Sequence, residues 1–205
     1  DFQATLETKP EKAIKLEKDA LAQIENITAD NARLVSNLHA NLGGLYRMNG
    51  HPDLAREHME KSISLLDQFN LLHINDSIPQ IANYAMFLTE QQEPERGISE
   101  LQKLSGIIKE YHSDECLDYA KVQETLATIY LMTANLSQAK THFKKAFKIY
   151  EKIWADETEM IEAKYREIQE LYPQVGSFLG QQISSSLTKQ LILLSRHNIQ
   201  PGYRF

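Results

Sequence analysis

The chain has 205 residues, a formal net charge of −6 at pH 7 and one cysteine, Cys116. This length allows a sizeable core. Acidic and basic residues are mixed without a basic stripe, and no apolar run approaches the ~20 residues of a membrane-spanning helix, so neither nucleic acid nor a membrane is an expected partner. A lone cysteine forms no internal disulfide, which favours a reducing, cytoplasmic environment.

The first predicted helix runs from Pro10 to about Asn26, with apolar residues at helical spacing. Proline suits the first turn of a helix, where its missing N–H costs no hydrogen bond. We expect Thr28 or Asp30 to cap the next helix, which should end near Asn49.

Three helix pairs are predicted from there on, over about 28–70, 76–111 and 114–154. Their turns fall at Gly50, at 92–94 and at 134–135. No stretch alternates polar and apolar residues as a half-buried strand would, and glycine is scarce. The sequence therefore predicts an all-α fold.

The helix pairs repeat with a period of 42 residues, since 85 − 43 = 42 and 127 − 85 = 42. A fixed period in this range indicates stacked structural repeats. Two antiparallel helices approach closely only where side chains are small. We therefore expect three close crossings, of Gly43 with Ala55, Ala85 with Gly97, and Ala127 with Ala139.

The period also predicts what lies at the two ends. Counted backwards, it makes Pro10–Asn26 the second helix of an earlier repeat, whose first helix would lie before Thr8. Because the chain also lacks an initiator methionine, we expect it to be cut from a longer protein. Counted forwards, Ile168 and Tyr172 keep the spacing of a fourth first helix.

After Pro173 the register is lost, but an apolar stripe continues at helical spacing and predicts a terminal capping helix: Leu179, Ile183, Leu187, Leu191 and Leu194. The expected units are therefore a truncated repeat (1–28), three repeats (29–72, 73–113, 114–155), a degenerate repeat with the capping helix (156–198) and a tail (199–205).

The repeats resemble those of tetratricopeptide repeat proteins, in the 42-residue variant found in kinesin light chains. The resemblance covers roughly residues 4–172 and is carried by Asn41-Leu42-Gly43 with Tyr46, Asn83-Tyr84-Ala85 with Leu88, and Leu126-Ala127 with Tyr130. Gln92 and Ala134 depart from the family's turn glycine, and Gly97 departs from its alanine. The family implies a right-handed α–α superhelix whose first helices line a concave groove.

Carried over position by position, the resemblance implies a peptide-binding groove that runs along the first helices of the repeats. Asn41 and Asn83 would lie one repeat apart and pair with a peptide backbone, because a carboxamide both donates and accepts hydrogen bonds; the alternative is that they satisfy nearby helix backbone or water. The methionines would form an adaptable apolar floor, or else belong to the core. The groove residues are Asn37, Asn41, Arg47, Met48, Asn83, Met86, Glu90, Lys121, Glu124, Thr128, Met132 and Arg166.

Another branch of the family clamps the acidic C-terminus of heat-shock chaperones with Lys, Arg and Asn. Of those positions only Asn83 and Lys121 fit, whereas Ala40, Gly44 and Thr125 do not, so this ligand is not expected.

No catalytic, cofactor or metal motif is visible. His51 and His58 lack a second ligand pair for zinc. Cys116 has no adjacent histidine or basic cluster that would activate its thiol.

The sequence therefore predicts a non-catalytic scaffold that holds a partner's peptide or helix in the groove. An alternative is a regulatory or sensor arm of a larger signalling protein, such as an NTPase or a transcription regulator. A third hypothesis is a homo-dimer formed through exposed end repeats.

Overall fold

The structure is a computed structural model that describes residues 2–173, without the side chains of residues 2–9 and 158. Over this range every regular element is a helix, so the predicted all-α fold is confirmed. The chain divides into two compact units, residues 1–146 and 147–205. The predicted capping helix and tail lie outside the described residues.

The first unit contains six complete helices and the start of a seventh. In chain order these are α1 (Phe2–Ala22), α2 (Ala32–Met48), α3 (Pro52–Gln68), α4 (Ser77–Glu90), α5 (Pro94–Tyr111), α6 (Leu117–Met132) and α7 (Leu136–Ile153).

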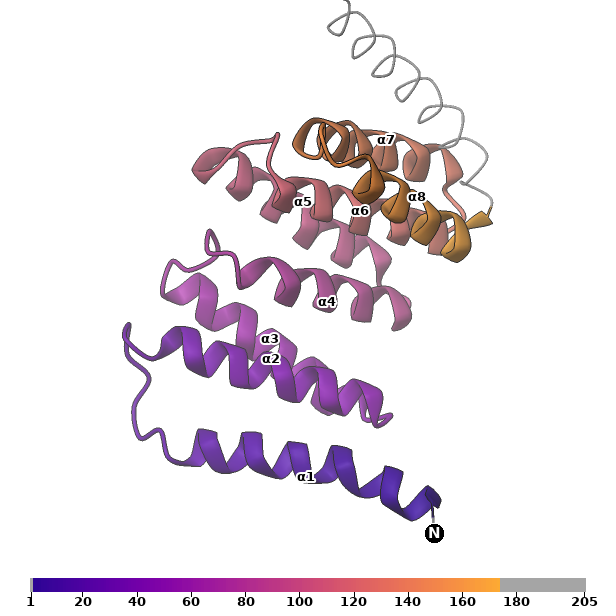
Figure 1. The fold of residues 1–205 in the computed structure, drawn as a ribbon. Helices are drawn as coiled ribbons and strands as arrows, with labels where there is room; N and C mark the ends of the chain where they lie inside the picture. Colours follow the sequence, from indigo (N-terminus) through magenta and orange to yellow (C-terminus); the bar gives the residue numbers. More distant parts are fainter. Residues whose placement is uncertain (1, 174–205) are drawn as a thin grey trace, which may run out of the picture. The chain divides into compact units, whose positions relative to one another are not determined.

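Neighbouring helices of the first unit form antiparallel pairs that stack on one another. α2 packs against α3 and α4 packs against α5, while contacts of α3 with α4 and of α5 with α6 join successive pairs. α1, α2 and α4 run across Figure 1 one above another. α4 also touches both α2 and α6, so the first helices of the three pairs lie along one side of the stack.

Small residues set the spacing within a pair, as the period predicted. A Cβ added at Gly43 would lie 3.2 Å from the carbonyl oxygen of Ala55 and 2.6 Å from Cγ of Met59. A Cβ added at Gly97 would lie 2.6 Å from the carbonyl oxygen of Ala85. The first two predicted crossings are therefore confirmed.

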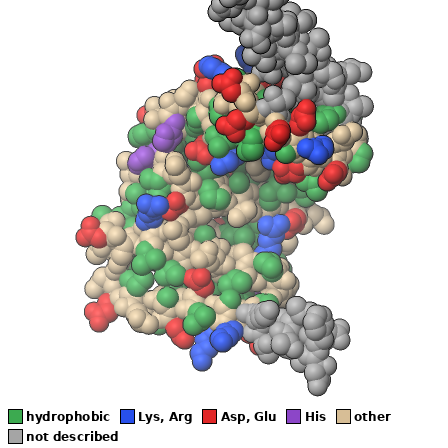
Figure 2. Space-filling model, in the orientation of Figure 1, with side chains coloured by type: hydrophobic (Ala, Val, Ile, Leu, Met, Phe, Trp, Pro, Cys, Tyr) green, Lys and Arg blue, Asp and Glu red, His purple; other side chains and the backbone are tan. Residues whose placement is uncertain are grey.

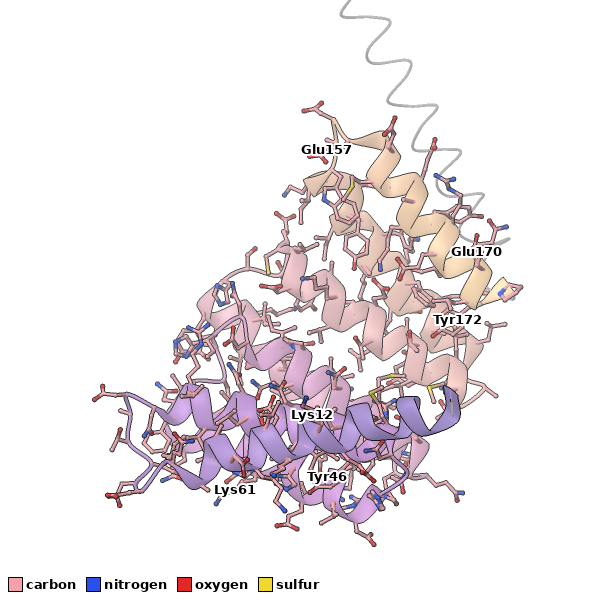
Figure 3. The ribbon with its side chains drawn as sticks, turned by 60° about the horizontal axis from the view of Figure 1, so that its bottom comes forward. Lys12, Tyr46, Lys61, Glu157, Glu170 and Tyr172 are labelled. Atoms are coloured by element: carbon pink, nitrogen blue, oxygen red, sulfur yellow. The ribbon has the colours of Figure 1, made fainter. Side chains whose placement is uncertain are left out.

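Large apolar side chains fill the space around the first crossing. The cluster contains Leu42, Tyr46 and Met59 together with Phe87 and Leu88 of the next pair. α1 covers this cluster, with Ile14 and Leu21 packed against it. Figure 3 brings α1 forward across the α2–α3 pair, from which Tyr46 and Lys61 are labelled.

The turns between paired helices share one backbone conformation. Gly50, Gln92 and Ala134, each 42 residues from the next, have φ of 73°, 65° and 58°. After each, the next N–H donates across the helix end, as His51 N does to the oxygen of Tyr46 at 2.9 Å. This is the Schellman arrangement that ends a helix.

Three expected helix starts are wrong. α1 begins at Phe2, so Pro10 lies inside the helix rather than in its first turn; its missing N–H removes one hydrogen bond without ending the helix. Asn31, not Thr28 or Asp30, is the N-cap of α2, and its Oδ1 accepts from the Thr28 N–H at 2.8 Å. α6 starts at Leu117 instead of near Asp114 because Cys116 occupies the N-cap, where its sulfur accepts from the Tyr119 N–H.

The second unit contains the end of α7 and α8 (Thr158–Leu171). At the end of α7, Tyr150 and Trp154 stack with ring centroids 4.8 Å apart. In α8, Ile161 and Ile168 are buried, so Ile168 takes the apolar position that the period assigns to a fourth first helix.

Candidate functional site

A pocket of about 600 Å³ lies between α2 and α4 of the first unit, with Met59 and Ser62 of α3 behind it. Its position follows from the repeat. The close crossing at Gly43 packs α3 against the back of α2, so α2 and α4 form the facing walls of the pocket. The wall from α2 consists of Asn37, Ala40, Asn41, Gly44, Arg47 and Met48.

The opposite wall comes from α4 and the loop before it. The loop contributes Asn75 and Asp76, and α4 contributes Pro79, Gln80 and Asn83. The pocket thus brings together five of the twelve predicted groove residues: Asn37, Asn41, Arg47, Met48 and Asn83.

A sixth predicted residue, Glu90, reaches this site through an ion pair. Nε of Arg47 donates to Oε2 of Glu90 at 2.8 Å, and a second guanidinium nitrogen donates to Oε1. A second ion pair joins Nε of Arg33 to Oδ2 of Asp76 at 2.6 Å. The hydrogen bond from Arg33, with that from Asn37, holds the pKa of Asp76 below its ordinary value. Both charges that line the pocket, on Arg47 and Asp76, are therefore already paired.

A buried polar network supports the α4 wall, and sequence reasoning missed it. Oε1 of Gln80 accepts from the hydroxyls of Ser36 and Ser62, which lie on α2 and α3. Nε2 of Gln80 donates to Oδ1 of Asn37, whose Nδ2 donates to Asp76. Both Oδ1 and Nδ2 of Asn37 are therefore engaged within the network, so Asn37 supports the wall of the pocket rather than binding a ligand.

Asn41 and Asn83 remain open to a ligand. Nδ2 of Asn41 donates to Oε1 of Glu17 on α1 at 3.0 Å, which leaves Oδ1 as an acceptor. Asn83 is exposed, and among the described residues none hydrogen-bonds to its carboxamide. Met48 adds an apolar surface that is 82% exposed.

The other predicted groove residues do not line this pocket. Met86 is half-buried elsewhere on α4, and Met132 is 47% exposed at the end of α6. Lys121 pairs with Asp118 at 3.6 Å, and the Thr128 hydroxyl donates to the carbonyl oxygen of Glu124. Arg166 belongs to the second unit, where its Nε donates to the carbonyl oxygen of Glu162.

A second feature is a histidine cluster that recurs after two periods. Nδ1 of His39 lies 2.9 Å from Nδ1 of His58, and Tyr46 stacks on His58 at 5.4 Å. The positions 84 residues later show the same arrangement, with Nδ1 of His142 2.9 Å from Oε1 of Gln123 and Tyr130 stacked on His142 at 5.3 Å.

Burial lowers the pKa of His39 and of His142 to about 4, and it also lowers the pKa of His58. The two rings in the first cluster are tilted by 34° with centroids 5.1 Å apart, and their Nδ1 atoms lie within hydrogen-bond distance, so one neutral ring donates to the other. In the part of the chain with described side chains, no three His, Cys, Asp or Glu residues gather as metal ligands would.

The surface charge is mixed. On the face drawn in Figure 2, basic and acidic side chains are interspersed among apolar ones rather than gathered into a field of one sign. Over residues 2–173, no helix combines the length and apolar character that crossing a membrane requires.

Comparisons with known proteins match part of the chain to a family and its fold to a solved structure. Residues 77–152, which run from α4 into α7, match the family described as Tetratricopeptide repeat. The crystal structure of BtubC (BKLC) from P. vanneervenii is similar with a TM-score of 0.68 at 17% sequence identity, over 98% of this chain and 80% of that one. No curated protein shows a significant match in sequence. The structural match is a likeness of fold.

Proposed function

Because the chain is a tetratricopeptide repeat protein, we propose that it is a non-catalytic scaffold that holds an extended peptide of a partner protein in the pocket between α2 and α4. Repeats of this family generally mediate protein–protein interaction. The observation that carries the proposal is that Oδ1 of Asn41 and the carboxamide of Asn83 are open to a ligand on the facing walls of that pocket.

The chemistry of these two groups suits a peptide backbone. Every non-proline residue of an extended peptide offers one N–H donor and one C=O acceptor. The Asn83 carboxamide offers the complementary acceptor and donor, and Oδ1 of Asn41 offers an acceptor across the pocket. Recognition through these groups does not depend on the side chains of the peptide.

The dimensions and the floor of the pocket also favour a short extended segment. Its volume of about 600 Å³ lies within the range of ~300–1,000 Å³ typical of ligand pockets. This space holds a few residues of extended chain. Met48 is flexible and polarizable, so it can adapt to different side chains of the peptide.

The test compares Asn41→Ala/Asn83→Ala with a matched control, Gln68→Ala/Gln102→Ala. The control removes two exposed carboxamides from α3 and α5, outside the pocket. Partners would be quantified by affinity purification and mass spectrometry from cells that express tagged forms of each protein. We expect specific partners to be lost from the asparagine variant and retained by the control, while both variants keep the wild-type melting temperature.

Partner recovery that is equal for the wild type and both variants would rule out the pocket as the binding surface. A lower melting temperature of the asparagine variant would show instead that the two residues support the fold.

A further inference from the structure

The charges around the pocket are arranged in pairs, and each pair joins α2 to the α4 side. Arg33 pairs with Asp76 at one end of the pocket and Arg47 pairs with Glu90 at the other. In both pairs the basic residue lies on α2 and its acidic partner follows 43 residues later. Each charge that lines the pocket, on Arg47 and Asp76, is thus paired with an opposite charge outside the lining.

The hydrogen-bonding groups left over are neutral. Among the described side chains that line the pocket, they are Oδ1 of Asn41 and the carboxamides of Asn75 and Asn83. The Glu17 carboxylate lies outside the lining of the pocket, where Oε1 accepts from Asn41 and Oε2 is buried. No unpaired charge is therefore offered to a ligand by the described residues that line the pocket.

A charged peptide gains little from such a pocket. A carboxylate that approaches Arg47 meets a guanidinium whose charge Glu90 already offsets, so it gains less than it would from an unpaired arginine. A basic side chain that approaches Asp76 likewise meets a carboxylate whose charge Arg33 already offsets. In both cases the ligand also loses the hydration of its own charge, whereas a neutral peptide meets only open amides.

From this arrangement we propose that the pocket selects uncharged, polar peptide segments, and that the Arg47–Glu90 pair enforces the selection by offsetting the charge of the arginine that lines the pocket. This inference rests on the proposed function, because it names the class of peptide that the same pocket takes. The pair lies at the surface, with both side chains about one-third exposed, so it can be altered without disturbing the core.

The experiment selects peptides from a random phage-displayed library on immobilised wild type, Glu90→Gln, Arg47→Gln and the double variant Arg47→Gln/Glu90→Gln. Asn41→Ala/Asn83→Ala serves as the background. Wild type and the double variant should enrich peptides poor in Asp, Glu, Lys and Arg. Glu90→Gln frees Arg47 and should enrich acidic peptides, and Arg47→Gln frees Glu90 and should enrich basic ones.

Salt dependence provides the second measurement, by fluorescence anisotropy of the selected peptides. Between 50 and 300 mM salt, affinity for wild type should change by less than about 2-fold, whereas Glu90→Gln should lose roughly 5-fold or more for its acidic peptides because salt screens exposed charges.

Charged peptides enriched on wild type but not on the asparagine variant would overturn the selectivity and leave the proposed function standing. Unchanged selectivity in Glu90→Gln would also overturn it. No enrichment on wild type above the asparagine variant would overturn both the selectivity and the proposed function.

Discussion

At the scale of single residues, two glycines of α5 show how far the repeat depends on side-chain size. Gly97 has no room for a methyl group, since an added Cβ would lie 2.6 Å from the carbonyl oxygen of Ala85. Gly106 lies on the same helix and is exposed, with nothing within 4 Å of an added Cβ. The same substitution should therefore have opposite effects at the two positions.

We expect Gly97→Ala to lower the free energy of unfolding by about 1–3 kcal/mol, because the helices must separate to accept the methyl group. Gly106→Ala should raise it by roughly 0.5–1 kcal/mol, since alanine restricts the unfolded chain and favours helix. Urea unfolding followed by circular dichroism measures both. Equal effects of the two substitutions would show that Gly97 is not held at a tight crossing.

At the scale of elements, the turns between paired helices keep one backbone conformation whichever residue occupies them. Gly50, Gln92 and Ala134 all adopt a left-handed conformation, although only the first is a glycine. Each turn is fixed by the same hydrogen bonds across the helix end, for example from Glu93 N to the oxygen of Leu88 at 2.8 Å. The departures from the turn glycine therefore add strain without changing the turn.

Gln92→Gly should raise the free energy of unfolding by about 0.5–1 kcal/mol, because glycine adopts positive φ without the cost that a Cβ imposes. Gln91→Gly is the matched control. Gln91 is the adjacent exposed glutamine, has φ of −84°, and should lose stability on the same substitution. A stabilisation of both variants, or of neither, would contradict the assignment of strain to Gln92.

Periodicity explains which elements could be predicted from the sequence. The crossings at Gly43 and Gly97 could be predicted because paired helices approach closely once every 42 residues, and each close approach requires small residues. The five groove residues around the pocket were instead implied by the resemblance to tetratricopeptide repeats, carried over position by position. The start of α1 was missed because the repeat pattern placed Pro10 in the first turn of a helix. The helix instead continues through Pro10, which removes one hydrogen bond.

The polar network of the pocket could not be predicted in the same way. Gln80 bonds to Ser36 and Ser62 across three helices, and a single glutamine leaves no periodic signal. The histidine clusters did leave one, since both His39 with Gln123 and His58 with His142 are 84 residues apart. That signal was missed because the intervening repeat places Ile81 and Glu100 at these positions.

At the scale of the whole first unit, these clusters link stability to pH. Burial lowers the pKa of His39 and His142 from 6.5 to about 4. The charge of Lys61 lowers the pKa of His39 further, whereas Glu57 raises it. The charge of Lys145 lowers the pKa of His142 further. Burial is also the main cause of the lowered pKa of His58, which Lys18 lowers further and Glu57 opposes. The native state thus favours the neutral rings. Well above pH 6.5 the rings are neutral in both the folded and the unfolded state. As the pH falls towards 4, the rings bind protons in the unfolded chain but stay neutral in the folded chain.

The free energy of unfolding should therefore fall by about 1–3 kcal/mol between pH 7 and pH 5, a range that allows for the partial exposure of these rings. His39→Gln copies the arrangement of Gln123 with His142, so it keeps a partner for His58 and removes one titrating ring. It should reduce the loss by roughly a third. Urea midpoints measured every half pH unit test this, and stability that stays flat from pH 7 to pH 5 would show that the buried rings are not held neutral by the fold.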